Sequence, residues 1–439
     1  MTKARSNHFF IVTSEFPPEP GVSGRMSGDL AGHLVAEGYQ ATVVCPYPSR
    51  PSGAIYPNSG GGTVTEETFR GARVIRVPSK ISPQSRFGPR MQESWSFGRW
   101  SSKVLSEQKP APDVVYSVTW PMLGQAWIGA SSARLAIPHV THIMDLYPES
   151  AWLKVPRLVR WATSWPLLSL DRWNALNACR VLVISDNMRQ AYVASRKIPQ
   201  ERVTVLPTWQ DESLFLRLPL RSEAAKVYGV REDHLTFFYL GNIGPVAGVD
   251  HLIHSFGQAG LENSQLLIVG EGTEKAACVQ LANHYRQAQI RFLSDPKIDN
   301  VPLLQSLADI CLLPVRQGAA LSSIPSKLSS YMLSAKPVLA SVDSESETAQ
   351  VIRAADCGWI VEPENQKALR AQIQSLARCQ RAELVETGLR GRSYALEHLS
   401  RSRGVRRLAA VLLEANATTA QSPERAPLSN PRQPLETQA

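Results

Sequence analysis

Short apolar runs alternate with helical patterns along most of the chain. In the N-terminal half, the runs that read as strands are residues 8–14, 41–45, 72–77, 113–118, 138–144, 180–185 and 203–207. A helix is predicted near residues 24–38, and helical patterns separate most of the later runs. Strands separated by helices form parallel sheets that are covered on both faces, so this half predicts a doubly wound α/β unit.

The alternation starts again after a polar, proline-containing passage near residues 207–222. Here the strand-like runs are residues 235–241, 264–270, 290–293, 309–314, 337–341 and 358–362. Two successive units of this kind predict an α/β protein with two Rossmann-like, doubly wound domains that face a cleft. We expect the first domain at residues 1–207, the second at 208–400, and a disordered tail at 417–439, where prolines recur without apolar periodicity.

The composition indicates a globular protein with reduced thiols. Of the 439 residues 43% are hydrophobic, and the six cysteines occur singly, which argues against structural zinc. The first residues, MTKARSNHFFIV, lack the long apolar core of a signal peptide, so we expect a cytoplasmic protein. Residues 114–133 carry no charge and reach the length of a membrane helix, but Pro121 and Gly124 favour a strand followed by a buried helix.

The chain is basic, with a formal net charge of +9. This charge alone is compatible with nucleic acid, anionic lipid or an anionic substrate. Signatures of nucleic-acid-binding motifs are not evident, so we expect no nucleic-acid partner. Motifs of other chemistries, such as GxxxxGK[ST], GxSxG and HExxH, are also missing from the sequence.

Ligands of doubly wound sheets bind at the carboxyl ends of the strands, so the residues that follow each strand are candidates for a site. Gly21 and Gly24 follow the first strand and lead into a helix for which Ser23 is the expected N-cap. Glycines allow close approach of a ligand, and a helix N-terminus suits phosphate. A simple left-handed turn explains the two glycines equally well.

Loops of the second half also suit an anion or sugar hydroxyls. Gly270, Glu271 and Lys275 follow one strand as half of a glycine-rich loop, although a tight turn with a solvated glutamate is the alternative. The run Pro325-Ser326-Lys327 begins a helix that carries no further charge until Lys336. The N–H groups and the dipole of a helix N-terminus attract anions, phosphate above all. An ordinary capped helix with a solvated lysine is the competing interpretation.

The order of several segments resembles that of the landmarks of GT-B glycosyltransferases, retaining family four. They are VTSEFPPEPGVSGRMSGDLAGHLVAEGYQATVV, HIMDLYPESAW, VLVISDNM, VTVLPTWQDESLF, FFYLGNIG, LLIVGEGTEK, GAALSSIPSKL and KPVLA. The likeness covers about residues 8–415. It is greatest to the subgroup that adds sugars to bacterial lipid-linked polysaccharide precursors, including N-acetylfucosaminyl- and fucosyltransferase-like enzymes of O-antigen and lipopolysaccharide biosynthesis.

The resemblance implies a glycosyltransferase of the hexosyltransferase type. The acceptor would bind in the N-terminal domain and a nucleoside diphosphate sugar, with UDP favoured, in the C-terminal domain, and a helix at residues 401–416 would cross back. Ser326, Lys327 and the helix dipole would stabilise the leaving diphosphate in place of a divalent metal, so no metal or other cofactor is expected. The implied donor-binding residues are Gly21, Gly24, Gly241, Asn242, Gly270, Glu271, Lys275, Ser326, Lys327 and Ser330.

The chain departs from the family pattern at two places. Asn242 and Ala247 stand where many members carry an arginine and a lysine, so two phosphate-binding cations are missing. Ser322 and Ser330 replace the usual pair of carboxylates, and Ser330 stands where a glutamate normally binds the nucleotide ribose. These departures put the donor or the activity in doubt.

Asp145 and His142, in HIMDLYPES, are the candidate catalytic residues. A carboxylate here could orient the acceptor hydroxyl or stabilise positive charge on the sugar. The alternatives are that Asp145 caps the following helix and that His142 is a buried strand histidine bonded to the backbone.

Eight of the ten tryptophans lie between Trp95 and Trp173, among several arginines at roughly helical spacing. Rings and cations arranged in this way suit a helix in a membrane interface, on anionic lipid, whereas tryptophans of the N-terminal core are the alternative. Membrane contact would fit a polyprenyl-diphosphate-linked glycan acceptor and a peripheral location on the inner face of the cytoplasmic membrane.

Three other functions remain open at this point. A nucleotide-sugar 2-epimerase has the same fold but needs no acceptor. A non-catalytic subunit that binds nucleotide sugar or lipid would fit the missing cations. DNA binding, against which the missing motifs argue, would require strongly salt-dependent affinity for duplexes.

Overall fold

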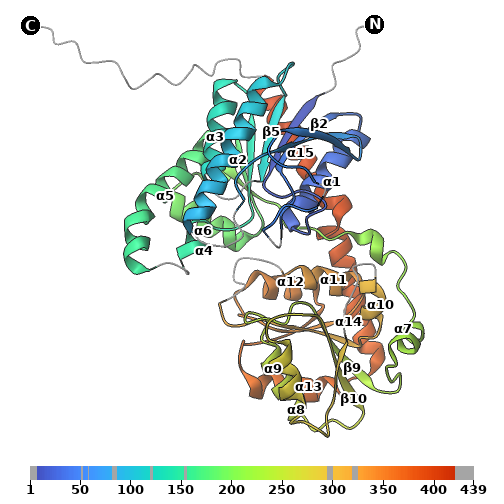
Figure 1. Ribbon diagram of the computed structural model, residues 1–439. Coiled ribbons are helices and arrows are strands. Elements are labelled where there is room, and N and C mark those ends of the chain that lie inside the picture. Colours follow the sequence, from blue (N-terminus) through green and yellow to red (C-terminus); the bar gives the residue numbers. More distant parts are fainter. Residues whose placement is uncertain are drawn as a thin grey trace, which may run out of the picture. The chain divides into compact units, whose positions relative to one another are not determined.

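The computed structural model describes residues 7–50, 53–57, 59–81, 87–118, 122–152, 156–293, 300–318 and 325–420. The chain divides into two compact units (Figure 1). Unit 1 contains Met1–Val183, Ala191–Thr204 and Val405–Ala439, and unit 2 contains Ile184–Gln190 and Val205–Gly404. The boundary expected after residue 207 therefore lies after Thr204, and one short segment of the N-terminal half belongs to unit 2.

Unit 1 is built on a sheet with the strand order β3-β4-β2-β1-β5-β6-β7-β8. Strand β1 pairs in parallel with β2 and β5, whereas β3 pairs antiparallel with β4 at the edge. All seven predicted strands are present, and β3 is an addition that the apolar pattern did not predict. The strands are β1 His8–Thr13, β2 Gln40–Pro46, β3 Thr65–Phe69, β4 Ala72–Val77, β5 Val114–Val118, β6 His139–Ile143, β7 Arg180–Val183 and β8 Val203–Val205.

Helices cover this sheet because its strands are apolar on both faces. Phe10 and Val12 of β1 pack in one cluster with Phe97 and Ile128 of two covering helices, while the intervening residues of β1 are also fully buried. The helices are α1 Val22–Ala36, α2 Phe87–Glu107, α3 Met122–Arg134, α4 Glu149–Trp152 and α5 Arg157–Asn177. Helix α6, Asp186–Arg196, belongs to unit 2 up to Gln190 and to unit 1 from Ala191. Within the described ranges, none of the helices combines the length and the apolar character needed to cross a membrane.

Unit 2 contains a parallel sheet with the order β11-β10-β9-β12-β13-β14. Its strands are β9 Leu235–Leu240, β10 Ser264–Val269, β11 Gln289–Leu293, β12 Ile310–Pro314, β13 Val338–Ser341 and β14 Gly358–Val361. Its helices are α7 Arg221–Tyr228, α8 Val249–Gly257, α9 Lys275–Ala282, α10 Val301–Ser306, α11 Ser326–Leu333, α12 Glu347–Ala355, α13 Gln366–Leu376 and α14 Arg381–His398.

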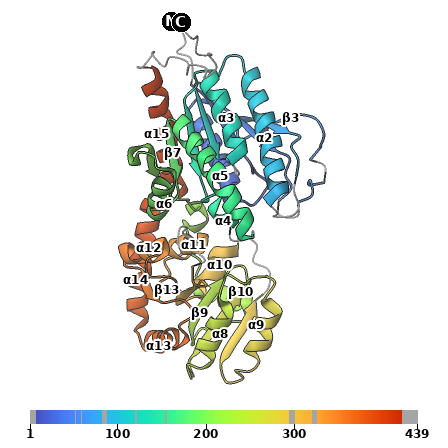
Figure 2. The same cartoon turned by 90° about the vertical axis from the view of Figure 1, so that its left-hand side faces the viewer.

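The side chains of β9 alternate between two cores. Phe237 and Tyr239 belong to a cluster with residues of α8 and α13, and Phe238 belongs to a second cluster with residues of α11 and α12. Figure 2 shows α8 and α9 beside β9 and β10. The sheet is thus covered on both faces, and the predicted α/β architecture of two Rossmann-like units is confirmed.

The last helix, α15 Arg401–Ala420, begins in unit 2 and continues in unit 1 from Val405. It extends beyond the predicted end at residue 416, so the first residues of the expected disordered tail are helical. Residues 421–439 lie outside the described part of the chain.

Candidate functional site

In unit 2 the ends of β9 and β10 are joined through two glycines. The amide of Gly241 donates a hydrogen bond to the carbonyl of Val269 at 2.9 Å. A Cβ atom on Gly270, whose φ is +149°, would lie 1.9 Å from the carbonyl oxygen of Gly241. Only glycine fits this contact, so Gly270 serves the close packing of the two strand ends.

Lys327 reaches these strand ends from the first turn of α11. The N-cap of the helix is Pro325, so the helix begins at Ser326, one residue later than predicted. The lysine side chain crosses Gly241, where a Cβ atom would lie 2.1 Å from Lys327 Cε. Its Nζ donates to the hydroxyl of Tyr239 at 2.8 Å and lies 4.5 Å from the centroid of that ring.

The ammonium of Lys327 is half-buried and has no carboxylate in ion-pair contact within the described part of the chain. Burial lowers the pKa of Lys327 to about 8. A cation that is removed from water without a counter-ion, beside a helix N-terminus, favours the binding of an anion.

The other implied donor residues of unit 2 differ in their exposure and in their contacts. Asn242 is exposed, and its carbonyl accepts from the hydroxyl of Tyr239 at 2.7 Å. Glu271 and Lys275 form an ion pair at 2.6 Å, with the glutamate exposed. Ser330 is buried and accepts a hydrogen bond from Gln305 Nε2 at 2.7 Å, so its hydroxyl lies in the core.

Ser326 and Ser322 are the two remaining serines that the sequence analysis named in this segment. Ser326 is exposed at the start of α11, and Ser322 lies outside the described residues. Over the ranges that the structure describes, no three His, Cys, Asp or Glu side chains are grouped in a way that could hold a metal ion.

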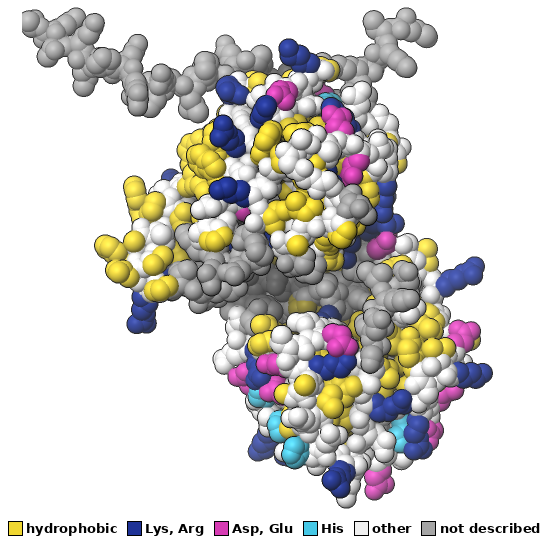
Figure 3. Space-filling model, viewed as in Figure 1, with side chains coloured by type: hydrophobic (Ala, Val, Ile, Leu, Met, Phe, Trp, Pro, Cys, Tyr) yellow, Lys and Arg dark blue, Asp and Glu magenta, His cyan; other side chains and the backbone are white. Residues whose placement is uncertain are grey.

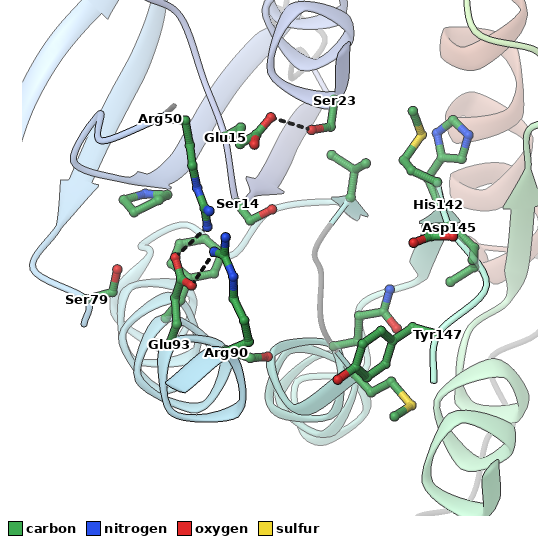
Figure 4. Close-up of a pocket in the computed structure, with 18 of the residues that line it drawn as sticks. Ser14, Glu15, Ser23, Arg50, Ser79, Arg90, Glu93, His142, Asp145 and Tyr147 are labelled. Carbon is green, nitrogen blue, oxygen red and sulfur yellow. Dashed lines mark hydrogen bonds and ion pairs between the residues drawn. The ribbon is translucent and has the colours of Figure 1, made fainter. Parts of the chain in front are cut away.

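Unit 1 has a cavity of about 290 Å³ at the carboxyl ends of its strands (Figure 4). Apolar walls come from residues such as Phe97, Val118 and Met122. The polar and charged lining residues are Ser14, Glu15, Ser23, Arg50, Ser79, Arg90, Glu93, Ser94, Gln125, His142, Asp145, Tyr147 and Asp171. A cavity with both kinds of wall can bind the hydroxyls and the apolar face of a sugar.

Glu15 occupies the turn in which we expected a phosphate. Helix α1 begins at Val22 with Gly21 as N-cap, so the prediction of Ser23 as N-cap is wrong. The hydroxyl of Ser23 instead donates to Glu15 Oε2 at 3.3 Å, and a Cβ atom on Gly21 would lie 1.6 Å from the same oxygen. Gly24 is also tight, since its Cβ would lie 3.0 Å from the carbonyl carbon of Glu15. Burial and then the neighbouring Glu19 raise the pKa of Glu15.

A second carboxylate of the cavity lies between two arginines. Arg50 and Arg90 donate to the two oxygens of Glu93 at 2.7 and 2.6 Å (Figure 4). Burial raises the pKa of Glu93. Sequence reasoning missed this group and Glu15, because Glu15 and Arg50 come from segments far from the Arg90–Glu93 pair of α2, and the group matches no motif.

His142 borders the cavity as a neutral imidazole. Its Nδ1 lies 2.9 Å from the hydroxyl of Tyr116, its Nε2 has no hydrogen-bond partner, and burial lowers its pKa to about 3. The buried Tyr116 hydroxyl has its hydrogen bond to Nδ1, so we assign Tyr116 as donor and the ring proton to Nε2. The partner of His142 is thus a side chain, not the backbone, and this tautomer has no basic nitrogen left for proton abstraction.

Asp145 lies between β6 and α4 and also lines the cavity. The segment that follows Asp145 is held by Arg196, whose side chain is fully buried. Arg196 pairs with Asp171 at 2.7 Å and with Glu149, and donates to the carbonyl of Tyr147 at 2.6 Å. This arrangement fixes Tyr147 and the start of α4 relative to α5.

Comparisons with solved structures agree with the fold. WaaG, a glycosyltransferase involved in lipopolysaccharide biosynthesis, superimposes with a TM-score of 0.63 at 18% identity, over 92% of this chain and 99% of that chain. HepE from Anabaena, in a complex with UDP, gives a TM-score of 0.67 at 14% identity, over 93% of this chain and 100% of that chain.

Sequence comparison leads to the same group. WcaI of Escherichia coli, assigned as a glycosyl transferase of colanic acid biosynthesis, is 23% identical over 375 residues, which are 82% of this chain and 89% of WcaI. The model of the glycosyl transferase 4-like domain matches residues 23–209, and that of the glycosyl transferases group 1 matches residues 221–390. The chain therefore belongs to the GT-B glycosyltransferases that join a glycosyl transferase 4-like domain to a group 1 domain.

Proposed function

We propose that the protein is a retaining, metal-independent glycosyltransferase of cell-surface polysaccharide biosynthesis. It transfers a sugar from a nucleoside diphosphate sugar, preferably a UDP sugar, to a polyprenyl-diphosphate-linked glycan. The names of WcaI and WaaG favour a polysaccharide or lipopolysaccharide product, and the UDP complex of HepE favours a UDP donor. The observation that carries the proposal is the half-buried, uncompensated ammonium of Lys327 at the strand ends of unit 2.

A nucleoside diphosphate supplies the charge that this site lacks. Its phosphates would accept hydrogen bonds from Lys327 Nζ and from the first N–H groups of α11. As the bond between the sugar and the diphosphate breaks, negative charge grows on the leaving oxygen, and fixed positive groups stabilise it there. The lysine and the helix N-terminus would do this work without a metal ion.

The cavity of unit 1 suits the acceptor sugar. Its volume of about 290 Å³ lies at the lower end of the range of ligand sites and fits one sugar unit. Glu15 and Asp145 offer carboxylate oxygens to hydroxyl groups, and His142 in the assigned tautomer offers an N–H. We propose that Asp145 orients the reacting hydroxyl, with His142 as a neutral donor.

In this mechanism the acceptor oxygen attacks the anomeric carbon from the face that the diphosphate leaves. The bond from the anomeric carbon to the acceptor oxygen forms as the bond to the diphosphate oxygen breaks. The proton of the acceptor hydroxyl passes to that diphosphate oxygen, so the configuration is retained without a protein nucleophile.

The test is turnover of UDP-N-acetylfucosamine and UDP-N-acetylglucosamine with and without a polyprenyl-diphosphate-linked N-acetylglucosamine. We expect UDP release only with the lipid-linked acceptor, and a product with the anomeric configuration of the donor by NMR. Conversion of the donor without acceptor would favour the 2-epimerase. Nucleotide binding without any turnover would favour the non-catalytic subunit.

We further propose that unit 1 binds an anionic membrane surface, the inner face of the cytoplasmic membrane, through α5. Leu158, Trp161 and Trp165 lie at i, i+3 and i+7, on one side of this helix, and are 75%, 80% and 79% exposed. Arg157 and Arg160 are exposed beside them, and residues 156–170 include no acidic residue. Figure 3 shows hydrophobic side chains over α5. Exposed indoles with neighbouring cations suit the headgroup region of anionic lipid.

Sedimentation with vesicles of phosphatidylglycerol and phosphatidylcholine tests this surface. Replacing Trp161 and Trp165 by serine should weaken binding at least tenfold, because both rings lose their burial in the interface. The matched control is Trp95→Ser, since Trp95 is 51% exposed on α2. Equal binding by the wild type and the double variant would exclude α5 as the membrane surface.

A further inference from the structure

Tyr239 lies between Lys327 and the Gly241–Asn242 loop, which are the two parts of the proposed diphosphate site. It lies near the end of β9, and its side chain is fully buried in the core formed with α8 and α13. Its hydroxyl is the atom that reaches the strand ends. There it contacts both Lys327 and the backbone of Asn242.

The direction of both hydrogen bonds follows from the groups involved. A carbonyl oxygen can only accept, so the single hydroxyl proton of Tyr239 is donated to the carbonyl of Asn242, at 2.7 Å. The lone pairs of the same hydroxyl then accept one N–H of Lys327 Nζ, at 2.8 Å. The face of the ring also lies 4.5 Å from this ammonium, at cation–π distance.

This arrangement holds the ammonium without cancelling its charge. A carboxylate at the same place would fix the lysine but neutralise it, and it would repel a diphosphate. A phenol contributes one acceptor and a ring face, and two N–H groups of Lys327 remain for a ligand. The absence of a side chain at Gly241 leaves room for the lysine to cross the strand end.

We propose that Tyr239 is a positioning residue, which sets the ammonium of Lys327 and the Gly241–Asn242 loop together for a nucleoside diphosphate. The role rests on the proposed function and gives a task to Tyr239, which the segment FFYLGNIG contains but for which the sequence predicted no role. It also gives a physical reason why the loop that contains Asn242 and Ala247 can bind a diphosphate without the two cations that related sequences carry at these positions. The site depends on one cation held in place before the ligand arrives, which lowers the cost of ordering it on binding.

The experiment compares Tyr239→Phe with Tyr331→Phe in calorimetric titrations of the full chain with UDP. Tyr331 is the matched control because it is also fully buried, and its hydroxyl binds the backbone N–H and carbonyl of the neighbouring Leu240 at 2.9 and 3.2 Å. We expect Tyr239→Phe to weaken UDP binding about fivefold or more at pH 7, the effect of one hydrogen bond to a charged group. Tyr331→Phe should leave the affinity within twofold of the wild type.

The pH profile separates positioning from a purely structural role. In the wild type, UDP affinity should fall as the pH rises through about 8, where Lys327 loses its proton. The hydroxyl of Tyr239 accepts from the charged form and so favours it, and its removal should move this midpoint to lower pH. An affinity and a midpoint equal to those of Tyr331→Phe would overturn the proposal for Tyr239 alone. If the wild type binds neither UDP nor GDP, both the proposal for Tyr239 and the proposed function are overturned.

A measurement on the unaltered sequence covers the case in which Tyr239→Phe does not fold. In protein labelled with 3-fluorotyrosine, one ¹⁹F resonance should titrate with Lys327, shift when UDP is added, and lose its titration in Lys327→Met. If every ¹⁹F resonance is unaffected by UDP, the proposal is overturned.

Discussion

Lys327→Met should make unit 2 more stable while it removes the proposed ligand contact. Methionine has a similar length and no charge. Burial lowers the pKa of Lys327 from 10.5 to about 8, and each pKa unit corresponds to about 1.4 kcal/mol. The protonated lysine therefore destabilises the folded state by roughly 3 kcal/mol at pH 7.

The pKa shift already includes every contact that favours the charged form, so the cation–π contact is not subtracted again. Methionine also loses the hydrogen bond to Tyr239, which a neutral amine would keep and which contributes about 1 kcal/mol. The net expectation is that Lys327→Met is more stable than the wild type by about 2 kcal/mol at pH 7. For a unit of this size, that is a rise in melting temperature of about 4–8 °C.

The pH dependence makes the prediction specific. Because the folded pKa lies below the unfolded value of 10.5, the unfolded chain binds more protons between about pH 8 and 10.5. Wild-type stability should thus rise with pH across this window, and the advantage of Lys327→Met should shrink and then reverse. Urea unfolding followed by circular dichroism at pH 7, 8.5 and 10 measures the difference. A difference that does not change with pH would refute the reasoning.

Three further outcomes follow from the described contacts. Asp145→Asn should lower turnover at least a hundredfold in the transferase assay and leave UDP affinity within twofold, since Asp145 lines the cavity of unit 1. Unchanged turnover would remove Asp145 from the mechanism. Gly270→Ala should lower the free energy of unfolding by about 2–4 kcal/mol in urea, because its Cβ would overlap a carbonyl oxygen. Gly260→Ala is the control: a Cβ there meets nothing within 4 Å, and its φ of +64° should cost only about 1 kcal/mol, so equal costs would contradict the packing argument. Arg196→Leu leaves two carboxylates without their partner and should destabilise unit 1 by about 3–5 kcal/mol in the same assay, so a neutral effect would show that this ion-pair group is not structural.

Most of the fold could be predicted because its strands are short, apolar and buried on both faces. Strand β3, Thr65–Phe69, escaped prediction because it is a largely exposed edge strand with the polar sequence TEETF. Its pairing depends on β4, which the local pattern does not show. The segment Ile184–Gln190 was placed in the wrong unit for a similar reason, since its packing is decided by residues far along the chain.

The site could be predicted only where local sequence determines it. Pro325-Ser326-Lys327 carries a local signal for a helix start, so its place at the strand ends follows from helix chemistry and the order of elements. Tyr239 looks like one more apolar residue of a strand, and its hydroxyl gains a role only through Lys327, far along the sequence. In the same way, the core position of Ser330 depends on Gln305 on another helix.

The central claim is that the strand ends of unit 2 bind a nucleoside diphosphate through Lys327. The most direct test is calorimetric titration of UDP, with GDP for comparison, into the wild type and Lys327→Met at pH 7. We predict that UDP binds the wild type and that Lys327→Met weakens binding at least tenfold, although the variant is no less stable. Equal affinity of the two proteins for UDP, or no binding of either nucleotide by the wild type, would contradict the claim.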